Sequence, residues 1–318
     1  MPIYVLWVSL QGISLNRLHM KKFLKIFMPM LAFALISACT DTGITPVPDG
    51  NEDQEQTDQT GQDEQTQQPE QLGPGPDFVS QFQKHVALWE FTGAWCANCP
   101  AGYTNLNFTL TAYSKYTDCV HMMAFHSDIE GKDELAIDAT DQIMIDMNVA
   151  PMGFPSYVVD MDLGGSLVES VMLKDHLDQT MTDNPCYCGV AVSSELADGQ
   201  ANVAVKLMSE VNASWRIGVY VVEDKVKYYQ KDGMREYPEY THRHVVRQIA
   251  SASYKGDRIG GQVTPAGTEL LADYKIAVDT AWNLDNTYIY VLALDSEGHV
   301  NNVNHCAIDG GNSDYNKL

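Results

Sequence analysis

Two cysteines separated by two residues, Cys96 and Cys99, have the clearest capacity for chemistry in the sequence. A thiolate is the nucleophile of thiol–disulfide exchange, so a reactive cysteine needs a lowered pKa. A position just before a helix provides this, because the unpaired N–H groups of the first turn favour negative charge. Pro100 fits such a turn, where its missing N–H costs little. The pattern predicts a redox pair in which Cys96 is the exposed attacking thiol and Cys99 resolves the mixed disulfide.

Two other interpretations of the cysteine pair remain open, namely a fixed structural disulfide and a metal clip. Metal is disfavoured because no second CxxC or CxxH completes a four-ligand site. His242 and His244 have the i, i+2 spacing of ligands on a strand, but such a pair alone is weak evidence. We therefore expect neither a metal nor a cofactor.

Strand and helix patterns alternate around this motif between residues 84 and 184. Near-continuous apolar runs predict buried strands at 85–91, 119–125 and 155–161. Apolar residues at helical spacing predict helices at 101–116, 134–148 and 166–181, and Gly164-Gly165 predicts a turn. This order implies a parallel or mixed sheet with right-handed crossovers.

From residue 189 onward the pattern changes to short β-branched or aromatic segments separated by Gly, Asp and Asn. About seven such strands predict an antiparallel β-sandwich. The expected fold class is therefore α/β plus β. One domain is expected at 78–185 and a second, the sandwich, at 186–318.

The N-terminal residues have the features of a targeting segment. Three lysines precede the apolar stretch 27–36, and a small-residue site ending in Cys39 resembles a bacterial lipobox. We expect residues 1–19 to be a mis-called start, 20–38 a lipoprotein signal peptide and Cys39 the lipidated residue. A plain secretory peptide is the alternative. Residues 39–77 contain ten acids, eight Gln and no Lys or Arg, which predicts a flexible tether.

Charge and cysteine content limit the partners and the compartment. The formal net charge of −22 disfavours nucleic acid and anionic lipid as partners, so the lipid alone is expected to attach the protein to a membrane. Six cysteines remain besides Cys39, and an even number in an exported protein predicts disulfide bonding.

The cysteine motif resembles that of a thioredoxin fold. Trp95 stands before CxxC at the join of a strand and a helix, and "GFPSYVV" (153–159) lies where that fold places a cis-proline. The mature chain is similar to a family of envelope lipoproteins of Gram-negative bacteria named for an outer membrane protein 28. The similarity lies in "EFTGAWCANCPAG" (90–102) and "YTHRHVVRQ" (240–248). The resemblance implies a thioredoxin-like domain followed by a β-domain, expected to be an Ig-like sandwich.

The resemblance also implies roles for individual residues. In thioredoxins a buried acid six residues before the first cysteine assists proton transfer from the second, and Glu90 occupies that position. A cis bond is expected before Pro155, and the substrate is expected to contact the three residues Trp95, Phe154 and Pro155. The fold suggests structural bridges Cys119–Cys186 and Cys188–Cys306, with the swapped pairing Cys119–Cys188 and Cys186–Cys306 as runner-up.

The resulting functional interpretation is a lipid-anchored outer membrane protein on the periplasmic or cell-surface face. Its CxxC site is expected to act as a thiol–disulfide oxidoreductase on protein thiols or disulfides. The alternative is a non-catalytic surface binding or adhesion lipoprotein that uses a thioredoxin scaffold and a β-sandwich.

Overall fold

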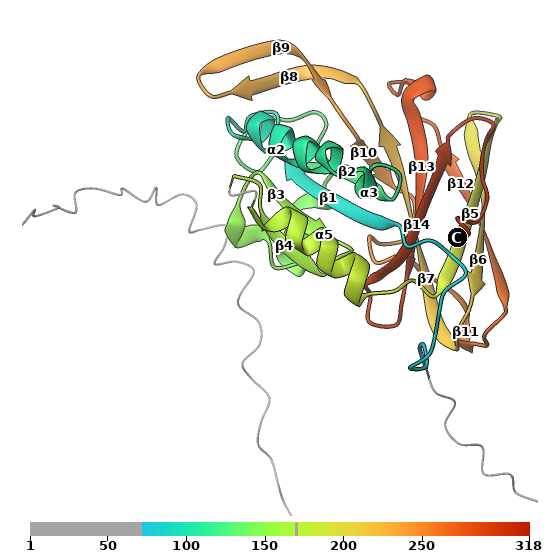
Figure 1. Ribbon diagram of the computed structural model, residues 1–318. Coiled ribbons are helices and arrows are strands. Elements are labelled where there is room, and N and C mark those ends of the chain that lie inside the picture. The colour runs from blue at the N-terminus through green and yellow to red at the C-terminus, as the bar shows by residue number, and fades with distance from the viewer. Residues whose placement is uncertain (1–71, 169–170) are drawn as a thin grey trace, which may run out of the picture. The chain divides into compact units, whose positions relative to one another are not determined.

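The computed structural model describes residues 72–168 and 171–318, which belong to one compact unit (Figure 1). The expected signal peptide, the lipidation at Cys39 and nearly all of the tether lie outside the described residues. Within those ranges the chain is mostly β, with few helices and several sheets. None of the described helices is long and apolar enough to cross a membrane.

The strands that carry the cysteine motif form the interior of a sheet. β1 (Val86–Thr92) pairs in parallel with β2 (Val120–His126) and antiparallel with β3 (Ser156–Val159), as its run of seven buried residues predicts. The turn predicted at Gly164-Gly165 is wrong, because both residues lie in β4 (Leu163–Ser166), which pairs with β3. A side chain at position 165 would approach the Tyr157 hydroxyl to 2.6 Å, so glycine makes room for that ring.

Helices cover both faces of these strands. The three helices packed on one face are α2 (Cys99–Ala112), α3 (Ser114–Thr117) and α5 (Val171–Asp183). α4 (Thr140–Asp146) packs on the other face and is followed by the short η1 (Ala150–Met152). α4 is shorter than the predicted helix at 134–148, because Asp133 accepts a hydrogen bond from Leu135 N–H and holds the preceding segment in turns.

The second half of the chain contains eleven strands rather than the seven expected. They are β5 (Cys188–Ala197), β6 (Gln200–Ser209), β7 (Ala213–Glu223), β8 (Val226–Asp232), β9 (Arg235–His242), β10 (Val245–Ile249), β11 (Asp257–Thr264), β12 (Glu269–Ala277), β13 (Thr287–Leu294), β14 (Val300–Ala307) and β15 (Gly311–Ser313), with the short η2 (Leu284–Asn286) before β13.

One sheet joins the two halves. Its strand order is β14-β13-β7-β10-β2-β1-β3-β4, with β11 also paired to β7. The junction is the parallel contact of β10 with β2, where Ala124 N–H donates to the His244 carbonyl at 2.7 Å. A second sheet, β12-β6-β5-β15, packs over the β7, β13 and β14 part around a common apolar core (Figure 1). The sheet therefore contains strands from both sides of the domain boundary that the sequence suggested between residues 185 and 186.

A buried asparagine fastens the second half to the start of β1. The Asn302 side chain is 1% exposed; its Oδ1 accepts from His85 N–H at 2.9 Å. Its Nδ2 donates to the Cys188 carbonyl at 2.8 Å and to the Gln83 carbonyl at 3.3 Å. One amide therefore satisfies backbone groups from two distant segments of the chain.

The two predicted structural bridges are not formed, which corrects the sequence-based pairing. Cys119, Cys186, Cys188 and Cys306 are buried free thiols. Three of the thiols instead point toward oxygen atoms: Cys119 Sγ donates to the Lys115 carbonyl, Cys186 Sγ to the Phe82 carbonyl, and Cys188 Sγ to Asn301 Oδ1. The fourth packs in the core between the two sheets.

Candidate functional site

Cys96 and Cys99 form a disulfide at the start of α2. Their Cα atoms are 5.5 Å apart, and Cys99 is the first residue of the helix. Pro100 follows in the first turn, and Asn98 occupies the N-cap position without a side-chain cap. Cys96 N–H donates to the Gly93 carbonyl at 3.0 Å, which folds the loop between β1 and α2 tightly. The predicted order of strand, cysteine pair and helix is therefore confirmed.

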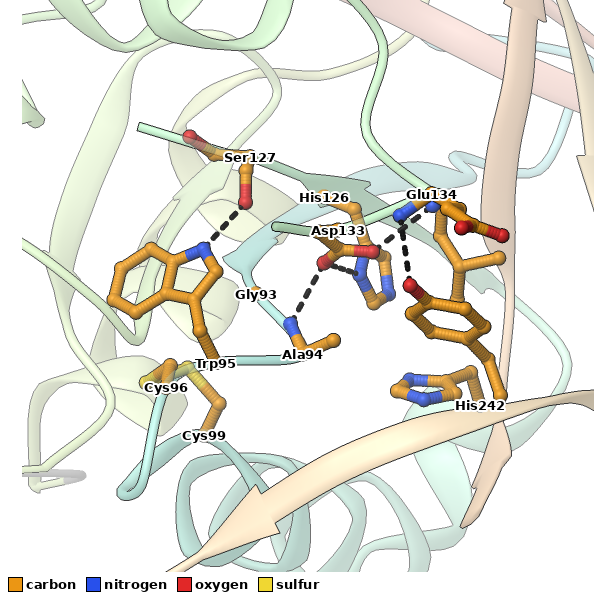
Figure 2. Close-up of polar contacts among 12 residues, drawn as sticks. Gly93, Ala94, Trp95, Cys96, Cys99, His126, Ser127, Asp133, Glu134 and His242 are labelled. Atoms are coloured by element: carbon orange, nitrogen blue, oxygen red, sulfur yellow. Dashed lines mark hydrogen bonds and ion pairs between the residues drawn. A yellow bond between two sulfur atoms is a disulfide. The ribbon is translucent and has the colours of Figure 1, made fainter. Parts of the chain in front are cut away.

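Trp95 is held beside the disulfide by small residues and one hydrogen bond. Its Nε1 donates to the Ser127 carbonyl at 2.7 Å (Figure 2). Side chains at Gly93 or Gly131 would come within 2.8 Å of Trp95 atoms, so glycine at both positions gives the indole its space. The Phe154 ring packs edge-on against the indole, with a distance of 5.2 Å between the two ring centroids.

The peptide bond between Phe154 and Pro155 is cis, as expected from the resemblance. Pro155 packs directly on α2 at Gly102, where a Cβ atom would lie 2.4 Å from the proline Cγ. The structure therefore brings Trp95 and Phe154 together, and Pro155 against the helix that begins with Cys99.

Glu90 lies on β1 and shares a pocket with Cys99. The residue is 2% exposed, and the pocket volume of about 20 Å³ has room for roughly one water molecule. Burial raises the pKa of the Glu90 carboxyl to about 8, so the group is mostly protonated at neutral pH. Glu90 is therefore buried and lines the same pocket as the second cysteine, and its role in proton transfer stays a prediction.

Asp133 connects the cysteine loop to a buried histidine. Its Oδ2 accepts from Ala94 N–H at 2.7 Å and contacts His126 Nδ1 at 2.7 Å (Figure 2). Burial alone raises the pKa of Asp133, but hydrogen bonds from His126 and from two backbone N–H groups hold it below its ordinary value. The carboxylate therefore remains charged and fixes the backbone one residue before Trp95.

His242 closes the other side of the pocket. Its ring lies 5.0 Å from that of His126, and its Nε2 is 3.2 Å from the Tyr229 carbonyl. Burial, assisted by His126, lowers the pKa of His242 to about 4, so the ring is neutral at pH 7. His244 contributes its carbonyl to the β10–β2 junction instead. In the ranges that the structure covers, no group of three or more His, Cys, Asp or Glu is arranged to hold a metal ion.

The β8–β9 hairpin lies over the cysteine loop and hydrogen-bonds to it. Gln230 is 2% exposed, and its Nε2 donates to the carbonyls of Cys96 at 3.0 Å and Gly93 at 3.2 Å. Two backbone bonds join the same loop: Lys231 N–H to the Ala94 carbonyl at 2.8 Å and Gly233 N–H to the Ala97 carbonyl at 2.9 Å. The hairpin and α2 pack side by side (Figure 1).

The hairpin changes one expectation about the cysteines. Cys96 is only 5% exposed, so the prediction that it is the exposed thiol is wrong for this conformation.

Three contributors to the site were missed from the sequence, namely Gln230, His126 and Asp133. The pair Asp232-Gly233 is a hairpin signal, but no local signal indicates where such a hairpin docks.

Comparisons with known proteins agree with an envelope protein. The solved structure of HBP35 of Porphyromonas gingivalis superposes with a TM-score of 0.61 and 17% identity, covering 72% of this chain and 77% of that one. At this identity the likeness concerns the fold alone. A search of curated proteins gives no significant match. The family model described as outer membrane protein Omp28 matches residues 140–311, which is more than half of the chain. The chain belongs to the Omp28 family of outer membrane proteins.

Proposed function

We propose that this envelope-associated protein is a thiol–disulfide oxidoreductase whose thioredoxin-like half, residues 78–185, carries the redox pair Cys96 and Cys99. The observation that supports this most directly is the pocket shared by Cys99 and the buried Glu90, whose raised pKa of about 8 gives it a transferable proton near neutral pH. A disulfide with only a structural purpose has no need of a buried, protonated acid at its side.

The proposed exchange uses groups already in place. A thiolate of a protein dithiol attacks the Cys96 sulfur, a substrate–Cys96 bond forms, and the Cys96–Cys99 bond breaks. Cys99 leaves as a thiolate and takes the proton of Glu90. The second substrate thiolate then attacks the substrate sulfur of the mixed disulfide and releases Cys96 as a thiolate. The substrate loses two electrons and the cysteine pair gains them; reduction of a protein disulfide is the reverse.

The finer features of the protein are part of the same proposal. Residues 186–318 would act as an Ig-like β-sandwich that shares its sheet with the thioredoxin-like half. The Omp28 family supports an outer membrane or envelope location. A lipid on Cys39 after removal of residues 20–38 would hold the protein there, with residues 39–77 as the tether.

The test is the exchange of the purified protein with a small disulfide, such as a fluorescent glutathione disulfide. The unaltered protein should accelerate its reduction by dithiothreitol, and Cys96→Ser should abolish the acceleration. Cys119→Ser, at a buried thiol outside the site, serves as the matched control and should keep the full rate. A wild-type rate equal to the uncatalysed rate would remove the oxidoreductase proposal.

One observation favours a second candidate, a non-catalytic binding protein on the same scaffold. Cys96 is 5% exposed beneath the hairpin, as expected for a disulfide that only staples the loop. Under this candidate the small disulfide would not react, and mild reduction followed by alkylation would leave Cys96 unmodified in the folded protein. The same experiment therefore decides between the two functions.

A further inference from the structure

The β8–β9 hairpin has the contacts of a cover over the redox pair. Four hydrogen bonds connect it to the loop 93–97, two from the Gln230 side chain and two from backbone N–H groups. In all four bonds the acceptor is a backbone carbonyl of the loop, so the hairpin attaches to the loop without using either sulfur. The carbonyls of Gly93 and Cys96 also accept N–H bonds from Cys96 and Cys99 within the loop, whereas those of Ala94 and Ala97 accept from the hairpin backbone.

Besides these four bonds, side-chain contacts at one end of the hairpin hold it in this position: the Tyr228 hydroxyl accepts from Glu134 N–H at 3.3 Å, and the centroid of the His242 ring lies 5.0 Å from that of His126. β8 and β9 form a two-stranded sheet that is separate from both larger sheets. Residues 235–239 of β9 are exposed, and Met234 at the turn is fully exposed. An isolated two-stranded ribbon with one face in solvent is marginally stable by itself. The hydrogen bonds to the loop are therefore a large part of what keeps the cover closed.

Both connections of the hairpin to the main sheet have hinge-like backbone. Lys225, between β7 and β8, has φ of 59°, and His244, between β9 and β10, has φ of 53°. Non-glycine residues rarely adopt this region, and such positions at the ends of elements are where hinges absorb backbone changes. The Asp224–Arg243 ion pair, 3.0 Å long, links the two strands at the same base. The ribbon thus leaves the sheet through two adjacent bends.

We propose that the hairpin determines which substrates reach Cys96, with Gln230 as the residue that holds it closed. In the closed arrangement the 5% exposure of Cys96 leaves room for small thiols and disulfides at most, whereas a polypeptide segment reaches the residue only after the hairpin swings away. The site then takes cysteine-containing polypeptides that can displace the hairpin from the carbonyls of the loop. This role rests on the proposed exchange chemistry for its purpose, but the cover itself is testable without any redox activity.

The experiment compares a small and a bulky reagent on Cys96 in a Cys99→Ser background, with modified cysteines identified by peptide mass. Iodoacetamide reports access for small molecules, and a polyethylene-glycol maleimide of about 5 kDa reports access for polymers. Gln230→Met keeps the side-chain length but removes both donors. If each lost bond is worth about fivefold in the closing equilibrium, the maleimide rate should rise about twenty-five-fold, with a much smaller change for iodoacetamide. Lys231→Ala, which keeps its backbone bond and alters only an exposed side chain, should leave both rates unchanged.

Hydrogen exchange of the unaltered protein provides a measurement that does not depend on a variant folding. The amides of Lys231 and Gly233 should exchange through a local opening, faster than those in the centre of β7. Exchange of these two amides only with global unfolding would overturn the proposal, as would a Gln230→Met maleimide rate equal to that of the parent. If the protein does not exchange with the small disulfide but the maleimide and hydrogen-exchange results are as expected, the proposed oxidoreductase function is wrong and the role of the hairpin as a cover stands.

Discussion

Replacing Glu90 with glutamine should change how the stability of the protein depends on pH. Burial raises the pKa of Glu90 from 4.5 to about 8. Between those values the folded protein holds a proton that the unfolded chain has lost. The free energy of unfolding of the wild type therefore falls as pH rises through this window, by about 1.4 kcal/mol per pH unit at its steepest. Glutamine has no proton to lose, so the variant should lack this contribution.

The size of the effect follows from the two pKa values. Between about pH 5 and pH 7 the free energy of unfolding of the wild type should fall by roughly 2.5 kcal/mol relative to that of Glu90→Gln. The difference between the two proteins isolates Glu90, because the other titrating groups are common to both. Constant costs of the amide, such as unsatisfied hydrogen bonds, shift the difference equally at every pH.

The assay is urea unfolding followed by circular dichroism at several pH values between about 5 and 8. Glu130→Gln, at an exposed acid, is the matched control and should follow the wild-type curve. A difference between Glu90→Gln and wild type that stays constant within about 0.5 kcal/mol from pH 5 to pH 7 would refute the reasoning. It would mean that the carboxyl is solvated and cannot hold its proton for Cys99.

Two further substitutions test the packing that positions the site. Asn302→Ala should lower the free energy of unfolding by about 3 kcal/mol, because it removes the Asn302 bonds to the buried His85 N–H and to the Cys188 carbonyl. The control Asn312→Ala, at an exposed residue of β15, should lower it by less than about 0.5 kcal/mol. Equal losses in urea unfolding would contradict the role of Asn302 in joining the two halves. Gly102→Ala should destabilise the protein despite a helix-propensity gain of about 1 kcal/mol, since the new Cβ meets Pro155 Cγ at 2.4 Å and overpacking costs about 1–3 kcal/mol. Ala101→Gly, on the exposed face of the same turn, measures the propensity part separately, and a thermal midpoint for Gly102→Ala above that of the wild type would show that Pro155 yields without cost.

Local patterns predicted the parts of the site that are close in sequence. The apolar run before the motif gave a strand with seven buried residues, and Pro100 marked the first turn of α2. Glu90 is buried, as its place in that run and the resemblance to thioredoxins suggested, although the run alone left a solvent-facing position open. These features depend on short spacing and periodicity, which a single sequence displays.

The remaining parts of the site depend on contacts between distant segments. Gln230 lies 134 positions from Cys96, and nothing in "KYYQKDGM" distinguishes it from an exposed strand glutamine. The junction of β10 with β2 was hidden for the same reason, since each strand alone reads as an ordinary apolar segment. The cysteine pairing, which was inferred from the expected fold, was wrong because that fold does not specify where the thiols point, and three of them point toward oxygen atoms.

The shared sheet has a consequence for the order in which the protein can fold. β2 pairs with β1 on one edge and with β10 on the other, but β10 begins only at Val245. While the chain is emerging during synthesis, the apolar strand edge of β2 therefore waits without its partner until most of the protein is available. Open edges of this kind pair readily with other chains. A chain that ends before Val245 should therefore leave this edge of β2 without its partner strand.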